Sequence, residues 1–426
     1  MIQTVRKAWN IPELRKKIVF TLLILLIYRL GNAIPVPYVD VAALSSYLES
    51  MSTTVLGLYN VMSGGAFADA TVFALSIQPY INASIIIQLL TVAIPALERM
   101  AREEGEEGRK KIASITRYTT VAIALIQGFA YYMLMRNQYN ILTNDSIAAA
   151  FVIIITFVAG SAFIMWLGEQ ITEFGIGNGI SIILFASIIS RIPAGVSTMY
   201  TNRETLGVVG LVAIVVGLLA LVILIAHVYN AERRIPVQYA KRQVGRRMYG
   251  GQNTTLPVKV NMSGVLPIIF AQSIAMLPAT IAAFLPAPEQ GTFWYGFIQA
   301  IDTKSVLYMI AYFLMIIGFS YFYATIQFNP TEIANNLKRN GGFIPGFRPG
   351  KPTADFIAKV LSRITLFGAI YLGIVAIAPL IAGKFIDLQG LAIGGTSIII
   401  VVGVALETVK ALENQMLARQ YKGFLE

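Results

Sequence analysis

Residues 56–95, LGLYNVMSGGAFADATVFALSIQPYINASIIIQLLTVAIP, join a broken apolar segment to an unbroken one. The first segment is a poor membrane span, because Gly64 and Gly65 interrupt it and Asp69 would be costly in hydrocarbon. The second, Phe73–Ile94, is long enough to cross a bilayer but carries several polar side chains. Irregular backbone at membrane depth is tolerated only inside protein or beside water. The stretch therefore predicts a short re-entrant half-helix that leads into a spanning helix with a polar face.

The composition is that of a chain with many membrane spans. Hydrophobic residues make up 56% of the 426 positions and charged residues only 13%, whereas soluble proteins have about 25%. The chain has no cysteine, which excludes disulfides, and one histidine, His227, which excludes multi-histidine metal sites. The first apolar run begins near Ile18 without a small-residue cleavage site, so we expect no cleavable leader.

Ten apolar segments approach the roughly 20 residues that a membrane-spanning helix needs. In chain order, the predicted spans are Ile18–Ala33, Phe73–Ile94, Ile115–Met135, Ile147–Leu167, Ile180–Ile192, Val208–Val228, Val265–Leu285, Val306–Phe328, Phe356–Leu380 and Ile393–Leu412. The fifth is short and follows the glycine-rich run Gly175–Gly179, which we interpret as a tight turn that caps this helix.

Basic residues are distributed very unequally between the two sides of these spans. With the N-terminus inside, 27 of the 33 Lys and Arg residues fall on the inner side. This positive-inside pattern predicts that both termini are cytoplasmic. Six basic residues remain on the outer side: Arg29, Arg136, Arg191, Arg203, Lys304 and Lys384.

Three inner segments are rich in charge. Residues 98–111 mix both signs and predict a solvated, salt-bridged loop. Residues 231–259 and 329–355 are longer than bare connections require, and they combine arginines with aromatic residues, glycines and prolines. We expect projecting hairpins that dock a protein or RNA partner, with topology charge and lipid headgroup contact as the alternative.

The predicted spans are almost free of charge at their centres, which argues against a pump or an ion-coupled transporter. Neither a nucleophile nor paired catalytic carboxylates nor a phosphate-binding loop is evident, so we expect no enzyme activity, cofactor or metal. The residues alone leave two functions open: a passive channel for polypeptides and a secondary transporter of a small solute. A structural scaffold would leave the polar second span unexplained.

Six separated blocks resemble the bacterial SecY family along essentially the whole chain. The blocks are SGGAF with QPYINASIIIQLLTV, GEQITEFGIGNGISIILF, RRIPVQYAKR, LPVKVNMSGVLPIIFAQSI, FIPGFRPGKPTADFI and IGGTSIIIVVGVALE. That family provides the channel subunit of the general protein translocase. The resemblance implies a protein-conducting channel that passes unfolded secretory proteins across the membrane and releases transmembrane helices sideways into lipid.

The resemblance also implies the architecture. It is an all-α integral membrane fold of ten transmembrane helices, in two inverted halves related by a pseudo-twofold axis. Residues 1–200 would form the N-terminal half and residues 201–426 the C-terminal half, hinged at about 192–207. Residues 231–259 and 329–355 would be the cytoplasmic docking loops.

A ring of aliphatic side chains constricts the pore in that family. By motif match, the ring would be Ile77, Ile81, Ile180, Leu184, Ile269 and Ile400, with Leu184 standing where isoleucine is common. Apolar side chains hold no water in a narrow constriction, so such a ring gates by dewetting. They also offer a passing peptide no hydrogen bond. The alternative is that these residues make ordinary helix–helix or lipid contacts.

The broken segment resembles the family's plug, which would span about residues 60–72 with the half-helix at Gly64–Thr71. The plug residues would be Gly64, Gly65, Ala66, Phe67, Ala68 and Asp69. Asp69 would face water on the outer side. The small residues would pack closely under the ring and leave it easily, and these are Gly64, Gly65, Ala66, Ala68 and Ala70. The alternative is a buried re-entrant turn that never moves.

The family opens sideways between spans two and three and spans seven and eight. Polar residues at this seam, the lateral gate, would be Gln88, Gln127 and Asn261. Interhelical amide bonds in membranes contribute only about 0.6–2 kcal/mol, which suits a latch that a signal helix replaces. For Gln127, simple helix–helix adhesion without gating is an equal alternative.

The resemblance assigns docking of a motor or ribosome to Lys241, Arg242 and Arg348. Arginine suits bidentate contact with carboxylate or phosphate. The implied partners are SecE-like and SecG-like small membrane subunits, a SecA-type ATPase motor, the ribosome, signal peptides, unfolded precursor chains and membrane lipids. The implied location is the bacterial cytoplasmic membrane, crossed many times.

Overall fold

The computed structural model describes most of the chain. The described residues are 2–50, 55–102, 104–137, 141–201, 203–239, 242–244, 247–249, 253–262, 264–284, 295–297, 300, 305–385 and 395–422.

Helices make up nearly all of the regular structure in the first half. They are α1 (Ile2–Trp9), α2 (Pro12–Gly31), α3 (Val41–Ser50), α4 (Val55–Met62), α5 (Gln78–Ala93), α6 (Pro95–Arg102), α7 (Gly105–Asn137), α8 (Ile147–Phe174), α9 (Gly179–Ile189) and α10 (Ile192–Thr201). The predicted turn at Gly175–Gly179 is confirmed, because the Asn178 side chain accepts hydrogen bonds from the first amides of α9.

The second half combines long helices with short strands. The helices are α11 (Arg203–Asn230), α12 (Leu266–Phe284), α14 (Val306–Gln327), α15 (Pro330–Arg339), α16 (Lys351–Phe385) and α17 (Gly395–Lys422). The strands are β1 (Glu232–Tyr239), β2 (Arg242–Val244), β3 (Arg247–Tyr249), β4 (Asn253–Lys259) and β5 (Gly342–Phe343). Gly207 interrupts α11 with φ 64°, within the predicted hinge.

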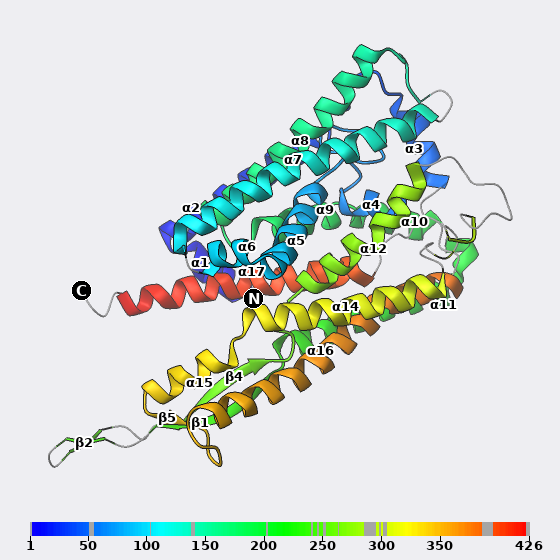
Figure 1. Cartoon of the computed structure of the whole chain (residues 1–426). Coiled ribbons are helices and arrows are strands. Elements are labelled where there is room, and N and C mark those ends of the chain that lie inside the picture. Colours follow the sequence, from blue (N-terminus) through cyan, green and yellow to red (C-terminus); the bar gives the residue numbers. More distant parts are fainter. Residues whose placement is uncertain are drawn as a thin grey trace.

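Figure 1 shows two groups of helices with α12 and α17 between them. The first group contains α2, α5, α7, α8 and α9, and the second contains α11, α14 and α16. Contacts join α12 to α5 and α7 on one side, and α17 to α9 on the other. The two halves therefore meet along two lines, one through α12 and one through α17.

A small sheet lies at the end of the bundle where the chain also ends (Figure 1). Strand β1 pairs antiparallel with β4, with Ile235 opposite Leu256, and with β5, with Gln238 opposite Phe343. Its buried side chains form a separate apolar cluster with Ile344 and Ile357. Strands β2 and β3 form their own antiparallel ribbon. The sheet therefore has a core of its own against α15 and α16.

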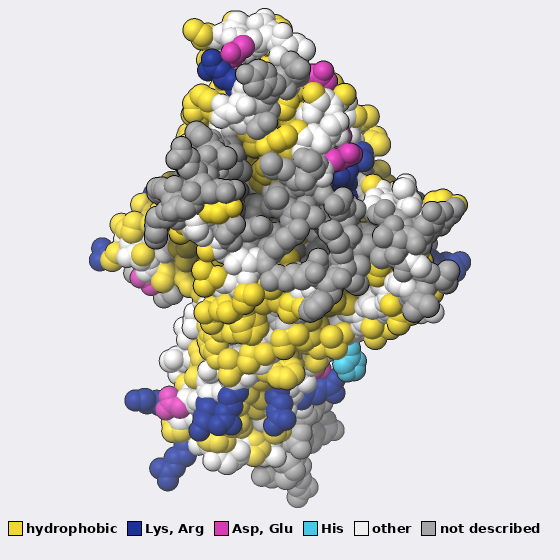
Figure 2. All heavy atoms as spheres, turned by 90° about the vertical axis from the view of Figure 1, so that its right-hand side faces the viewer, with side chains coloured by type: hydrophobic (Ala, Val, Ile, Leu, Met, Phe, Trp, Pro, Cys, Tyr) yellow, Lys and Arg dark blue, Asp and Glu magenta, His cyan; other side chains and the backbone are white. Residues whose placement is uncertain are grey.

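Each of the ten predicted spans falls on a helix of the structure. By length and composition, six helices among the described residues are suited to cross a membrane, or up to seven if the bent pair α5 and α6 is one span. The number of ten spans therefore stays a prediction. Figure 2 shows a band of hydrophobic side chains bordered by a row of Lys and Arg, as at a membrane boundary.

Three local predictions need correction. The prediction of a re-entrant half-helix at Gly64–Thr71 is wrong. The helix of this stretch, α4, ends at Met62, and turns follow it to Ile77. Residues 98–111 do form ion pairs, Lys111 Nζ lying 3.0 Å from Glu104 Oε2, but residues 98–102 belong to α6 and residues 105–111 to α7, with Glu104 between the two helices. The predicted hairpin at 231–259 is confirmed by β1 and β4, whereas 329–355 forms a helix and a short strand.

Candidate functional site

The six residues predicted as a pore ring come from α5, its N-cap, α9, α12 and α17. Five of them, Ile77, Ile81, Leu184, Ile269 and Ile400, are at most 2% exposed and belong to one continuous apolar cluster. Ile180 packs against this cluster and is partly buried. Residues from both halves of the chain thus share one apolar centre, although the ring itself stays a prediction.

The predicted plug begins at a turn that α2 and α9 hold in place. The carbonyl of Ser63 accepts hydrogen bonds from Tyr28 Oη and Asn32 Nδ2, each at 3.4 Å. The carbonyl of Gly64 accepts from Arg29 Nη1, also at 3.4 Å. Gly64 and Gly65 have φ of 71° and 95°, a conformation that favours glycine.

The rest of the plug is buried under aromatic and backbone contacts. The Phe67 ring stacks on Tyr131 of α7, with centroids 4.3 Å apart, and the Tyr131 hydroxyl donates to the Phe67 carbonyl. The Ala70 carbonyl accepts from the Val36 amide at 2.9 Å. Asp69 alone among the predicted plug residues is exposed, as expected for a residue that faces water. Phe67 and Ala68 belong to the same apolar cluster as the predicted ring.

Among the described residues, one side-chain hydrogen bond crosses the predicted lateral gate. Tyr323 Oη of α14 donates to Gln88 Oε1 of α5 at 2.9 Å. Tyr323 also packs on Phe270 of α12, with ring centroids 5.2 Å apart. The structure thus ties predicted spans two, seven and eight together. Nothing in the aromatic run FSYFYATIQ marks Tyr323 out, so sequence reasoning missed it.

The other two predicted gate residues are not joined to Gln88. Gln127 lies on α7, and its buried Oε1 has no hydrogen-bond partner among the described residues. The backbone of Asn261 lies against α16, since its Cα is 4.0 Å from the position of a Cβ on Gly368. Their gating roles stay predictions.

Tyr323→Phe should shift the gate towards its open state by about 3- to 30-fold, because it removes one interhelical hydrogen bond of about 0.6–2 kcal/mol. The measurement is the export of a precursor with a weakened signal segment, which should increase. Tyr321→Phe is the matched control, since Tyr321 Oη donates to Ser362 of α16 within the same half. An equal increase in both variants would contradict a latch at Tyr323.

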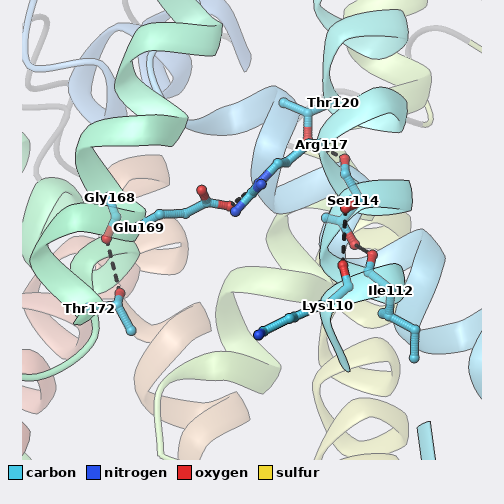
Figure 3. A network of polar contacts seen from close by, with 9 residues as sticks. Lys110, Ile112, Ser114, Arg117, Thr120, Gly168, Glu169 and Thr172 are labelled. Atoms are coloured by element: carbon cyan, nitrogen blue, oxygen red, sulfur yellow. Dashed lines mark hydrogen bonds and ion pairs between the residues drawn. The ribbon is translucent and has the colours of Figure 1, made fainter. Parts of the chain in front are cut away.

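A cavity of about 570 Å³ opens between α5, α7, α8 and α9. Tyr80, Arg117, Glu169 and the predicted ring residue Ile180 are among its lining residues. Figure 3 shows Arg117 of α7 and Glu169 of α8 pointing towards one another, with Nε and Oε1 2.9 Å apart. The Arg117 side chain is 52% exposed, so this ion pair contributes at most about 1 kcal/mol. One wall of the cavity therefore carries an ion pair, and the cavity is apolar at Ile180.

The structure describes only part of the three predicted docking residues. Lys241 lies outside the described residues, and Arg242 is described only as backbone of β2. Arg348 is exposed, and its carbonyl accepts a hydrogen bond from Thr353 Oγ1 at 2.7 Å. Its neighbour Phe347 stacks on Phe356 of α16 at 4.1 Å. Arg348 therefore projects from a turn that its neighbours hold rigidly.

Comparison with known proteins gives a consistent result. The family model described as SecY matches residues 71–409. A protein translocase subunit SecY of Streptomyces scabiei is 44% identical over 441 residues and covers 100% of both chains. The subunit of the same name from Halalkalibacterium halodurans is 42% identical over 436 residues, again with 100% of both chains covered. That from Mycobacterium tuberculosis is 43% identical over 433 residues and covers 97% of each chain.

Solved structures share the fold at low identity. One described as a protein-conducting channel has a TM-score of 0.68 at 18% identity, and covers 95% of this chain and 93% of that one. Sec61 in a canine ribosome–channel complex has a TM-score of 0.63 at 16% identity, with the same coverage. These likenesses support the arrangement of helices described above.

Proposed function

The chain belongs to the SecY family, and on that premise we propose that it is the channel subunit of a protein translocase. It conducts unfolded secretory proteins across the bacterial cytoplasmic membrane, which it crosses many times. It is a channel and not an enzyme, so the energy for movement comes from a partner. The observation that carries the proposal is the apolar cluster in which helices of both halves meet the largely buried segment Ser63–Ile77.

The pore ring is the part of this proposal that decides conduction. Ile81 of α5, Ile269 of α12 and Ile400 of α17 would surround the path of the chain, with Ile77, Ile180 and Leu184 completing the ring. A narrow apolar constriction excludes water and hence ions when empty, yet gives way to a peptide without forming hydrogen bonds to it. The polar cavity beside Ile180 would be the inner approach to the ring.

The plug and the lateral gate would then open the channel in different directions, the plug across the membrane and the gate towards lipid. Displacing the plug requires breaking the Phe67–Tyr131 contact, whereas the Gly64–Gly65 turn remains attached to α2. Parting α5 from α14 requires breaking the Gln88–Tyr323 hydrogen bond and lets a hydrophobic segment reach lipid. A signal helix that offers replacement contacts would shift the equilibrium towards the open state.

The proposal is tested by comparing two transport activities of the reconstituted protein. Liposomes that contain the full complex should import a precursor only with a leader peptide and an active ATPase motor. Radiolabelled small solutes should not accumulate in liposomes with or without the motor. Solute uptake by the chain alone, together with failure to import any precursor, would instead establish a secondary transporter.

For the partners, we propose a SecA-type motor and the ribosome on the inner face, with SecE-like and SecG-like subunits in the membrane. The inner sheet, α15 and the Arg348 turn would be the docking surface. Arg348 supports this because it is exposed between Gly346 and Gly350, which have φ of 88° and 104° and fix the turn. The planar guanidinium is a pre-organised fork of donors, so less side-chain entropy is lost for each hydrogen bond that it forms to a carboxylate or phosphate.

Arg348→Glu should lower motor-driven precursor import by about tenfold or more, since it replaces a charge-assisted contact with like-charge repulsion. The measurement is the initial import rate at low and at physiological salt, with the larger defect at low salt. Arg109→Glu is the control, because Arg109 is an equally exposed inner arginine at the start of α7. Identical rates for Arg348→Glu and the unmodified chain would remove Arg348 from the docking surface.

A further inference from the structure

Two arginines, one on α2 and one between α9 and α10, converge on one peptide link of the plug. Arg29, in the last turn of α2, donates from Nη1 to the Gly64 carbonyl at 3.4 Å and to Ser190 Oγ at 3.2 Å. Arg191 follows α9, and its Nη1 lies 2.9 Å from the position that a Cβ on Gly65 would take. Both guanidinium groups therefore lie against the Gly64–Gly65 link.

The positive charge of this pair is not neutralised within the described part of the chain. Another arginine on the predicted outer side, Arg136, does form an ion pair: its Nε lies 3.1 Å from Asp145 Oδ1. Neither Arg29 nor Arg191 forms an ion pair with a carboxylate among the described residues. Two like charges held side by side repel, and an anion between them would remove this repulsion.

The pair lies where a lipid-facing surface ends. On α2, Leu26 and Leu30 are 62% and 60% exposed, and they flank Arg29. Ile192, next to Arg191, is 43% exposed. Exposed leucines on a spanning helix face hydrocarbon, and an arginine at the end of that helix extends to the headgroups. Both arginines also belong to the six basic residues on the predicted outer side, where basic residues are scarce.

We propose that Arg29 and Arg191 form a binding site for the phosphate of an outer-leaflet phospholipid. Two guanidinium groups present planar forks of donors that match phosphate oxygens. The adjacent exposed leucines would contact the acyl chains, which a free phosphate ion lacks. Because Arg29 also holds the Gly64 carbonyl, the bound lipid would steady the attached end of the plug. That last effect rests on the proposed function, whereas the lipid site itself does not.

The test is a titration of the purified complex with phosphatidylglycerol in detergent, followed by native mass spectrometry that counts bound lipids. The Arg29→Gln, Arg191→Gln double variant should bind the first lipid about tenfold or more weakly, because it loses the charge-assisted hydrogen bonds. The Arg29→Lys, Arg191→Lys variant keeps both charges but loses the forks, and it should bind several-fold more weakly. Arg136→Gln, the control, should bind as the unmodified chain does.

Equal first-lipid affinity in the double glutamine variant and the unmodified chain would overturn the proposal. So would an equal loss in Arg136→Gln. Inorganic phosphate is the second probe: it should not displace the lipid at matched concentration. Displacement by inorganic phosphate would show a site for free anions and would overturn the lipid assignment. None of these readouts depends on protein transport, so a failed lipid site and a failed channel proposal give different results.

Discussion

Gly160→Leu is expected to leave little folded protein, because its side chain would clash with the backbone of Val72. A Cβ at Gly160 of α8 would lie 2.9 Å from the carbonyl carbon of Val72, and closer still to its oxygen. Backbone cannot rotate away as a flexible side chain does, so the segment after the plug must move. Val72 donates to the Ile34 carbonyl at 2.9 Å, and this bond would be lost as well. Overpacking costs about 1–3 kcal/mol and occasionally more, and the upper end applies to a backbone clash.

The measurement is the fraction of purified protein that remains monodisperse after heating in detergent. Gly217→Leu on α11 is the matched control, because in the described part of the chain no atom beyond the neighbouring turns of α11 lies within 4 Å of a Cβ built there. That variant should behave as the unmodified chain. If Gly160→Leu resists heat as well as the unmodified chain does, then α8 does not pack closely on the backbone of Val72.

A double change in the pore ring should have the largest functional effect. Ile81→Asn with Ile269→Asn places two amide groups in a constriction that otherwise excludes water. Ion flux through the resting channel should rise at least about tenfold, which corresponds to ~1.4 kcal/mol off the permeation barrier. The measurement is ion flux from liposomes that contain the complex but no precursor.

Ile153→Asn distinguishes a ring from an ordinary core. Ile153 of α8 is 0% exposed and belongs to the same apolar cluster, but it is not a ring residue. Its substitution should destabilise the protein without raising ion flux, because a buried amide without a partner costs free energy wherever it lies. Equal flux increases from both variants would mean that the ring has no special role.

The order of helices along the chain could be predicted well from the sequence. The length of each apolar segment and the charge of the segments beside it are both local patterns. All ten predicted spans fall on helices, and the turn before α9 is capped by Asn178 as expected. The hairpin at 231–259 was also predictable, because strand-forming residues flank a basic, glycine-containing tip, whereas its docking role stays a prediction. These features depend on residues that are close together in the chain.

The missed features depend on contacts between distant residues. The plug is not a regular helix, because some of its backbone groups bond to other segments, such as the Ala70 carbonyl to the Val36 amide, and its internal bonds, such as Thr71 to Ala66, form turns. Tyr323 and Gln88 are 235 residues apart, and neither position has a local pattern that identifies the other. Strand β5 has only two residues, which is too short for any periodicity, and it forms only because β1 offers a free edge.

The central claim, that Ile269 lies beside the path of a translocating chain, is tested most directly by crosslinking. The chain has no cysteine, so a single cysteine at Ile269 gives one reactive site. We predict a crosslink to a stalled precursor that requires both its leader peptide and the motor. A cysteine at Leu219 of α11, 58% exposed and lipid-facing, should give none. No crosslink at Ile269, with equal reaction at Leu219, would contradict the assignment of the pore.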